Sequence, residues 1–202
     1  ISQIVFADGT TWDAAAIDAH TVNQAGTANT MTGTAGNDAF VVDHANDVIN
    51  ESLNAGIDSV SSSVSHTLRP NVENLTLTGV LNTDGIGNEL QNTIQGNAGD
   101  NYLYGGAAPG QGGRDLLADT LSGGAGNDTY LSYGGGTGGY EDIIVEAPNE
   151  GYDTLRASSY SAVLPDNVEA MIVAALQQRA RIAPAFSYAR TIMGRASSRI
   201  AC

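Results

Sequence analysis

The strongest constraint on the fold of this chain is a repeat of nine residues. From residue 87 onward the sequence divides into five nonamers, and four of them carry Asn or Asp at position six and a large apolar residue at position eight. The position-six residues are Asn92, Asn101, Asp119 and Asp128, and the position-eight residues are Ile94, Leu103, Leu121 and Tyr130. The same frame fits residues 24–41, where Asn29 and Asp38 take position six. Self-similarity at a fixed period is typical of a fold built from stacked copies of one unit.

A longer repeat overlies the nonamers. Residues 33–38 recur as 123–128, much of 47–58 recurs as 142–153, and parts of 68–73 recur as 164–169. We therefore expect five parts. They are 1–22 as the closing strand of a preceding repeat block, 23–86 as a first repeat unit with linking strands, 87–131 as the nonapeptide block, 132–169 as a second linking-strand unit, and 170–202 as an atypical tail.

The residue types of the nonamer indicate how it folds. Glycine at positions one, two and four permits positive φ and therefore a tight turn, and Asn or Asp at position six tolerates a turn and presents an oxygen. The last three residues favour extended structure with one side chain pointing inward. Two turns and two strands then complete one circuit, and turns on the same side are 18 residues apart and stack at about 4.8 Å. The sequence predicts an all-β fold, a parallel β-roll or β-solenoid.

Charge limits the partners of such a roll. The chain has 22 acidic residues against 8 basic ones, all Arg, and a net charge of −14. This balance argues against nucleic acid and anionic lipid, which both require compensating positive charge. Hard oxygen ligands without His or Cys favour Ca²⁺ over zinc. The single cysteine, Cys202, excludes a disulfide framework. The apolar runs are too short to predict a membrane span.

Two segments carry a resemblance to a known family. GTAGNDAFV from Gly33 and GGAGNDTYL from Gly123 closely resemble the nonapeptide GGxGxDxUx of the RTX, or haemolysin-type calcium-binding, repeats. DVINE at residues 47–51, GIDSV at 56–60 and NVENLTLTG at 71–79 are similar to segments that link such blocks, and IVFADGTTW at 4–12 is similar to a closing strand. The resemblance implies a parallel β-roll that binds Ca²⁺ in its turns, export by a type I secretion machinery, and folding outside the cell.

The ligands expected from this pattern are the position-six carboxylates and nearby carbonyls. We predict that Asp38, Asp119 and Asp128 bind Ca²⁺, assisted by Asn101 and by carbonyl groups of Gly33, Gly36, Gly123 and Gly126. With turns 18 residues apart, Asp119 faces the turn of Asn101, and Asp128 faces that of Gly110. Neither pair holds two carboxylates, so we expect few sites, with weak affinity of roughly 10⁻⁴–10⁻³ M.

Glu51, Asp58, Glu146 and Asp153 also recur between the two copies. Residues in such positions are more often turn or solvated-face residues than ligands, so they rank as secondary ligand candidates. Because equivalent acids occur in each copy, a structural role is favoured over a single acid–base pair, and the sequence lacks the common hydrolase and nucleotide-binding motifs. We therefore expect no catalysis from this chain.

The tail differs in composition. Residues 170–202 hold five of the eight Arg and no acidic residue. Helix propensity over residues 169–181 indicates a short C-terminal helix, which would cap the open end of a solenoid. The alternatives are a frayed terminus and a repeat lost through a frame shift or truncation. The last is slightly favoured because TIMG at 191–194 resembles TIQG at 93–96.

Together these features predict a calcium-binding β-roll from a secreted or cell-surface bacterial protein, with Ca²⁺ as structural ligand and folding switch. The self-repulsion of the acidic repeat block would keep it loose without metal, and binding energy would become folding energy. Three alternatives stay open. The chain could be the non-catalytic tail of a secreted hydrolase such as a protease, lipase or polysaccharide-modifying enzyme, an adhesin or surface-layer segment, or a degenerate roll that folds without metal through amide hydrogen bonds.

Overall fold

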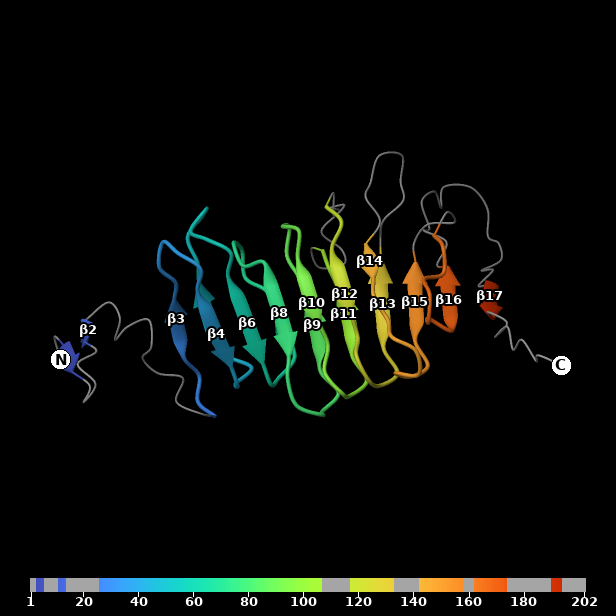
Figure 1. Cartoon of the computed structure of the whole chain (residues 1–202), viewed down its shortest axis with the longest axis horizontal. Helices are drawn as coiled ribbons and strands as arrows, with labels where there is room; N and C mark the ends of the chain where they lie inside the picture. The colour runs from blue at the N-terminus through green and yellow to red at the C-terminus, as the bar shows by residue number, and fades with distance from the viewer. Residues whose placement is uncertain are drawn as a thin grey trace, which may run out of the picture.

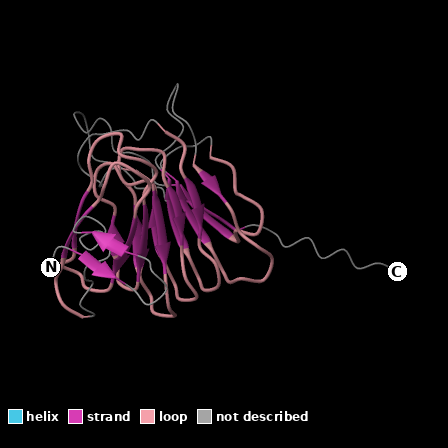
Figure 2. Cartoon of the chain, turned by 60° about the vertical axis from the view of Figure 1, so that its left-hand side comes forward, coloured by secondary structure: helices cyan, strands magenta, loops and turns pink. Residues whose placement is uncertain are grey.

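The computed structural model describes residues 3–5, 11–13, 26–106, 117–132, 142–157, 162–173 and 190–193. Every regular element within these ranges is a β-strand, so the all-β prediction is confirmed. The chain crosses back and forth between two parallel sheets, and successive coils lie side by side along the roll (Figure 1). Seen obliquely, the strands form the walls of the roll and loops join them at the corners (Figure 2).

One wall is a six-stranded parallel sheet. Its order follows the chain, with every second strand of the roll taking part. Its strands are β4 (Ala39–Val42), β6 (Ser59–Ser62), β8 (Asn74–Leu77), β10 (Thr93–Gln95), β12 (Thr120–Ser122) and β14 (Ile143–Ile144).

The second wall is a seven-stranded sheet, parallel except at its last pair. Its strands are β7 (His66–Thr67), β9 (Asp84–Ile86), β11 (Tyr102–Tyr104), β13 (Thr129–Ser132), β15 (Thr154–Ala157), β16 (Ala170–Val173) and β17 (Arg190–Met193). A parallel pair, β3 (Thr30–Thr32) and β5 (Val48–Asn50), lies at the N-terminal end of the roll. β1 (Gln3–Val5) and β2 (Thr11–Asp13) form a separate antiparallel pair.

The core is a column of apolar side chains, most of them from the middle of short strands. The position-eight residues Ile94, Leu103, Leu121 and Tyr130 are all fully buried, as the nonamer pattern predicts. Side chains of the linking strands, such as Leu75, continue the same cluster. Burying a side chain of this size stabilises the fold by about 1.5–3 kcal/mol, so each coil adds a small increment and depends on its neighbours.

Within the nonamer block, the stacking period departs from the prediction at the third nonamer. β9 and β11 pair Asp84 with Tyr102, 18 residues on, as expected. In contrast, β10 pairs Thr93 with Thr120, and β11 pairs Tyr102 with Thr129. The third nonamer therefore does not supply the partner strand to either neighbour, and its residues from 107 onward lie outside the described ranges. The sequence of this nonamer agrees, because Gly110 and Gly112 stand where the other nonamers have Asn or Asp and a large apolar residue.

The predicted helix over residues 169–181 is wrong where the structure describes it. Residues 170–173 form β16, which adds to β15 in parallel, and 174–181 lie outside the described residues. Burial of Met171 in the core outweighs the weak helix propensity of this segment. β17, which contains the repeat-like Thr191 and Ile192, pairs antiparallel with β16, whereas a repeat unit would pair in parallel. No helix occurs in the described ranges, and hence none that could cross a membrane.

Candidate metal centre

The residue immediately before a strand links its coil to the next one along the first wall. The N–H of Asp38, which precedes β4, donates to Oδ1 of Asp58 at 2.8 Å, and the N–H of Asp58 donates to Oε2 of Glu73 at 2.8 Å. These carboxylates lie in register because the parallel strands that follow them are in register. The in-register stacking of the repeats thus places acidic side chains one above another.

The same series of N–H to side-chain oxygen bonds between successive coils, which we call the ladder, occurs on the second wall. Oδ1 of Asp128 accepts the N–H of Asn101 at 2.7 Å, Oδ1 of Asp153 accepts the N–H of Asp128 at 2.8 Å, and Oε2 of Glu169 accepts the N–H of Asp153 at 2.7 Å. The long repeat is therefore a structural repeat. Its two copies start on opposite walls of the roll, since β4 belongs to the six-stranded sheet and β13 to the seven-stranded one.

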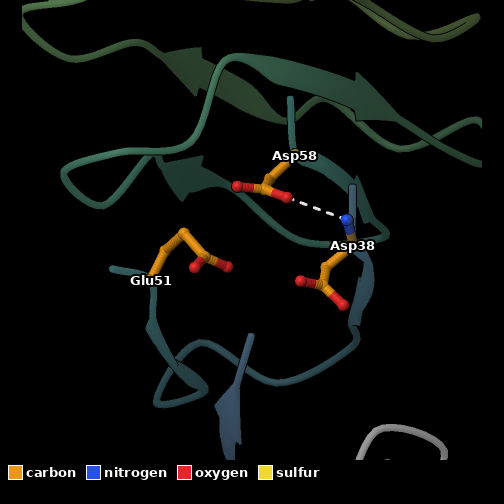
Figure 3. A group of neighbouring side chains, drawn as sticks. All are labelled: Asp38, Glu51 and Asp58. Carbon is orange, nitrogen blue, oxygen red and sulfur yellow. Dashed lines mark hydrogen bonds between the residues drawn. The ribbon is translucent and has the colours of Figure 1, made fainter. Parts of the chain in front are cut away.

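The first acidic group consists of Asp38, Glu51 and Asp58. One carboxylate oxygen from each lies within 4.8 Å of one from each of the others, and the three side chains surround a common space (Figure 3). Glu51 comes from the corner after β5, and its Oε1 accepts the N–H of Ser52 at 2.7 Å. Both oxygens of Asp38 are in contact with Thr34, whose N–H donates to Oδ2 at 2.7 Å.

The second acidic group consists of Asp128, Glu146 and Asp153, the counterparts of the first three residues. All three side chains are buried, with Asp128 and Asp153 each 1% exposed. One feature is particular to this group: the hydroxyl of Tyr130 contacts Oε1 of Glu146. The first group has Phe40 at the corresponding place, so it lacks this hydroxyl.

Both groups contain carboxylate oxygens that the protein leaves without a hydrogen bond. These atoms are fully buried, and they are Oε2 of Glu51, Oδ2 of Asp58, Oδ2 of Asp128 and Oε2 of Glu146. A buried charged oxygen with no partner costs several kcal/mol. A hard cation with carboxylate ligands removes that cost, and calcium takes oxygen ligands in flexible arrangements. The donor set and the unpartnered oxygens therefore fit a calcium ion.

The electrostatics of the groups agree with this fit. Burial, together with the charges of Asp153, Asp100 and Glu150, raises the pKa of Asp128 to about 7. Burial and the charges of Asp153 and Asp128 raise the pKa of Glu146 to about 8. The pKa of Glu51 is also raised by burial and by the neighbouring acids of its own group. In each group the aspartates thus disfavour the negative charge of the glutamate.

Two glycines make room for these groups. A Cβ at Gly33 would overlap the carboxylate of Glu51, and a Cβ at Gly123 would overlap that of Asp128. The expectation of positive φ at position one is wrong for Gly33 and Gly123, whereas Gly124 and Gly126, at positions two and four of the second copy, have φ of 86° and 129°. Position one is therefore glycine for close approach, and turn geometry requires glycine at positions two and four of the second copy, but not at Gly36 of the first. Gly36 and Gly126 lie against Gly56 and Gly151 of the following coil.

The structure places the other predicted ligands differently. Asp119 is fully buried and faces Asn92, whose N–H donates to its Oδ1 at 2.7 Å, and its own N–H donates to Asp142 at 3.3 Å. The predicted facing of Asp119 with Asn101, and of Asp128 with Gly110, is therefore wrong, since the shifted stacking brings Asp128 beside Asn101 and Asp153. The inference that no facing pair holds two carboxylates is wrong for the same reason.

Asn101 uses its side-chain amide within the protein. Its Oδ1 accepts the N–H of Asn97 at 2.8 Å, and its Nδ2 donates to the carbonyl of Thr83 at 2.7 Å. Asn101 lies next to the second acidic group through its backbone rather than its side chain. The residues ranked as secondary candidates, Glu51 and Glu146 above all, supply the third carboxylate of each group. Their recurrence in the long repeat, together with that of Asp58 and Asp153, was the signal that pointed to them.

Comparison with known proteins identifies the repeats. The family model of the RTX calcium-binding nonapeptide repeat matches in four copies, over residues 25–50, 86–108 and 118–136. No curated protein and no solved structure gives a significant match. The chain therefore carries RTX repeats wound into a β-roll. RTX nonapeptide repeats bind Ca²⁺, so calcium is the cofactor of this roll, and the two acidic groups include Asp38 and Asp128 from the matched segments.

Proposed function

We propose that the two acidic groups are the principal calcium sites of this chain and that calcium binding completes the fold of a non-catalytic module of a secreted bacterial protein. The observation that carries the proposal is the set of four buried carboxylate oxygens without hydrogen-bond partners, two in each group. Asp38, Glu51 and Asp58 would hold one ion, and Asp128, Glu146 and Asp153 the other. Three carboxylates per site favour tighter binding than the ~10⁻⁴ M typical of weak extracellular modules.

A folding role follows from the position of the sites. Each group joins side chains from successive coils, so an ion there links coils that are otherwise held by short strands and a few hydrogen bonds at the corners. A ligand that binds only the folded state stabilises it by about 2.7 kcal/mol at 100 times its dissociation constant. Because calcium is scarce inside cells and abundant outside, this linkage supports folding after export, consistent with the secreted context of RTX repeats.

Acid–base catalysis is disfavoured by burial. Asp58, Asp128 and Asp153 are at most 1% exposed, so a substrate could not reach them without opening the roll. The same arrangement occurs twice, which suits a repeated structural site better than a single active site. These features support a non-catalytic role for the described residues.

The proposal is tested by calorimetric titration of the full chain, freed of metal, with Ca²⁺ and with Mg²⁺. We expect two calcium ions per chain, little response to Mg²⁺, and a gain of strand signal in far-ultraviolet circular dichroism with Ca²⁺. The double variant Glu51→Gln, Glu146→Gln should lose both ions, whereas Glu89→Gln, an exposed residue outside both groups, should bind like the parent chain. Calcium binding that survives in the double variant would place the sites elsewhere.

A further inference from the structure

The middle of the roll is held by asparagine side chains instead of acidic groups. Two of the corners between the acidic groups each carry Asn at positions two and six of their nonamers. They are Asn88 and Asn92 in the first corner, and Asn97 and Asn101 in the second. Asn92 is fully buried and Asn101 nearly so. These two corners join strands β9, β10 and β11.

Each of these side chains bonds through both ends of its amide. Oδ1 of Asn92 accepts the N–H of Asn88 at 2.7 Å, and its Nδ2 donates to the carbonyls of Val72 and Glu73 at 3.2 and 3.1 Å. Nδ2 therefore connects one corner to the corner of the preceding coil. The bond is direct, and it needs no ion.

The second corner repeats the arrangement on the opposite wall. Oδ1 of Asn101 accepts the N–H of Asn97 at 2.8 Å, as Oδ2 of Asp38 accepts the N–H of Thr34 at 2.7 Å. Nδ2 of Asn101 donates to the carbonyl of Thr83 and to Oδ1 of Asn97 at 2.7 and 3.0 Å. The amide nitrogen thus gathers one oxygen from the preceding coil and one from its own corner, as a cation does between stacked carboxylates.

The position-two asparagines complete the network. Nδ2 of Asn88 donates to the carbonyls of Arg69 and Val72, and Nδ2 of Asn97 donates to those of Thr78 and Leu81. The acidic corners have Thr34 and Gly124 at this position instead. Asn at positions two and six together therefore distinguishes an amide corner from an acidic one.

We propose that Asn92 and Asn101 join the central coils without a cation, so that the roll has a cation-independent centre between two calcium-dependent ends. This inference rests on the proposed function for the ends, and it limits the dependence on calcium to the coils outside the centre. Amide nitrogens of the centre donate hydrogen bonds at the place where the ends require an ion. The centre, from β8 to β11, folds in the absence of calcium, and the coils of the two acidic groups order against it when calcium binds.

Hydrogen exchange measured by mass spectrometry on the full chain tests this division. In EDTA we expect residues 84–86, 93–95 and 102–104 to keep their protection, and residues 39–42, 129–132 and 154–157 to exchange at least ten times faster than in calcium. Equal loss of protection in the centre and at the ends would overturn the inference while leaving calcium binding itself intact. Equal protection everywhere in both buffers, with no calcium bound, would overturn the proposed function instead.

Substitution of the amide tests its role directly. In Asn101→Asp an oxygen replaces Nδ2 and faces the carbonyl of Thr83, so the centre should exchange at least ten times faster in EDTA and recover in calcium. Asn92→Asp should behave alike, which covers the case in which one variant fails to fold. Gln95→Glu adds the same charge to the exposed face of β10. Its hydrogen exchange should match that of the parent chain both in EDTA and in calcium. Full protection of both Asp variants in EDTA, or no recovery of either in calcium, would contradict a cation-like role for the nitrogen.

Discussion

The N–H of Asp38 donates to Oδ1 of Asp58 at 2.8 Å, while Oδ2 of Asp58 is buried without a hydrogen-bond partner. One oxygen of the second aspartate therefore belongs to the ladder, and the other belongs to the acidic group. Asp153 likewise accepts the N–H of Asp128 through its Oδ1 and contributes a carboxylate oxygen to its acidic group. This separation of roles makes the two aspartates good positions at which to change charge while keeping shape.

We expect Asp58→Asn and Asp153→Asn each to remove one calcium ion without unfolding the roll. The amide oxygen can still accept the ladder bond, but the negative charge is lost. Calorimetry should show one ion fewer for each variant and none for the pair. The stabilisation by calcium is about 2.7 kcal/mol per site at 100 times the dissociation constant, and it should fall in proportion to the number of ions lost. Asp84→Asn, on the exposed face of β9, serves as the control, and an unchanged ion count in both variants would contradict the assignment.

Two glycines in one turn should differ in their response to substitution by alanine. Gly33→Ala places a Cβ against the carboxylate of Glu51, so we expect loss of calcium at the first group and destabilisation by about 1–3 kcal/mol. Gly36→Ala places its Cβ no closer than 4.0 Å to Thr34 and should stay within about 0.5 kcal/mol of the parent. Chemical denaturation with and without calcium measures both. A Gly33→Ala variant that binds two ions would be inconsistent with this geometry.

Stability in the absence of calcium should fall as pH rises. Burial raises the pKa of Asp128 to about 7 and that of Glu146 to about 8, above the values of these groups in the unfolded chain. A raised carboxyl pKa means that the folded state binds the proton more tightly, so its contribution is full in acid and is lost as pH rises through about 7 to 8. Thermal unfolding in EDTA from about pH 5 to about pH 8.5 measures this, and Glu146→Gln should flatten the dependence.

In the presence of calcium, the stability should instead increase as pH rises. Binding requires the carboxylates to lose their protons, so the affinity of the second group should increase as pH rises over the same range. Calorimetry in buffers of different ionisation enthalpy would detect the protons released. A calcium affinity that is independent of pH between 6 and 8 would mean that Asp128 and Glu146 are not ligands.

The hydroxyl of Tyr130 should make the two sites unequal. It contacts Oε1 of Glu146, whereas the first group has Phe40 in its place. In Tyr130→Phe we expect tighter calcium binding at the second group, because the oxygen no longer bonds to a hydroxyl. Stability in EDTA at neutral pH should drop by about 0.5–1.5 kcal/mol, the usual net contribution of a hydrogen bond, because a pKa of about 8 leaves Glu146 largely protonated there. Site-resolved calcium titration would test this, with Phe40→Tyr expected to weaken the first group.

The sequence was sufficient to predict the roll because the nonamer combines local and long-range information. Position eight predicted the buried column that includes Leu103 and Tyr130, and position six predicted that Asp128 would lie in a stacked turn, where the structure places it in the ladder. Both follow from the alternation of a short strand, which fixes the side chain that points inward once the turn is defined. The same alternation appears in β15, where Leu155 and Ala157 are buried and Arg156 is exposed.

The acidic groups could not be assembled from the nonamers alone. Glu51 and Glu146 lie outside them, and they reach Asp38 and Asp128 only because the roll stacks one coil on another. The facing of Asp119 was misplaced because a fixed period of 18 ignores a turn that does not contribute to the stack. Helix propensity failed at Met171 because burial against the preceding coil decided the conformation. In each case contacts distant in sequence outweighed the local pattern.

The ladder has a direction. In every such bond between position-six or equivalent residues the N–H comes earlier in the sequence than the side chain that accepts it, by 15 to 27 residues. In a chain that emerges with its N-terminus first, the ladder N–H of the coil at the growing edge therefore lacks its acceptor until the following coil arrives. Assembly that starts at the opposite terminus meets no such delay in the ladder, because the accepting side chain is in place before the N–H that donates to it.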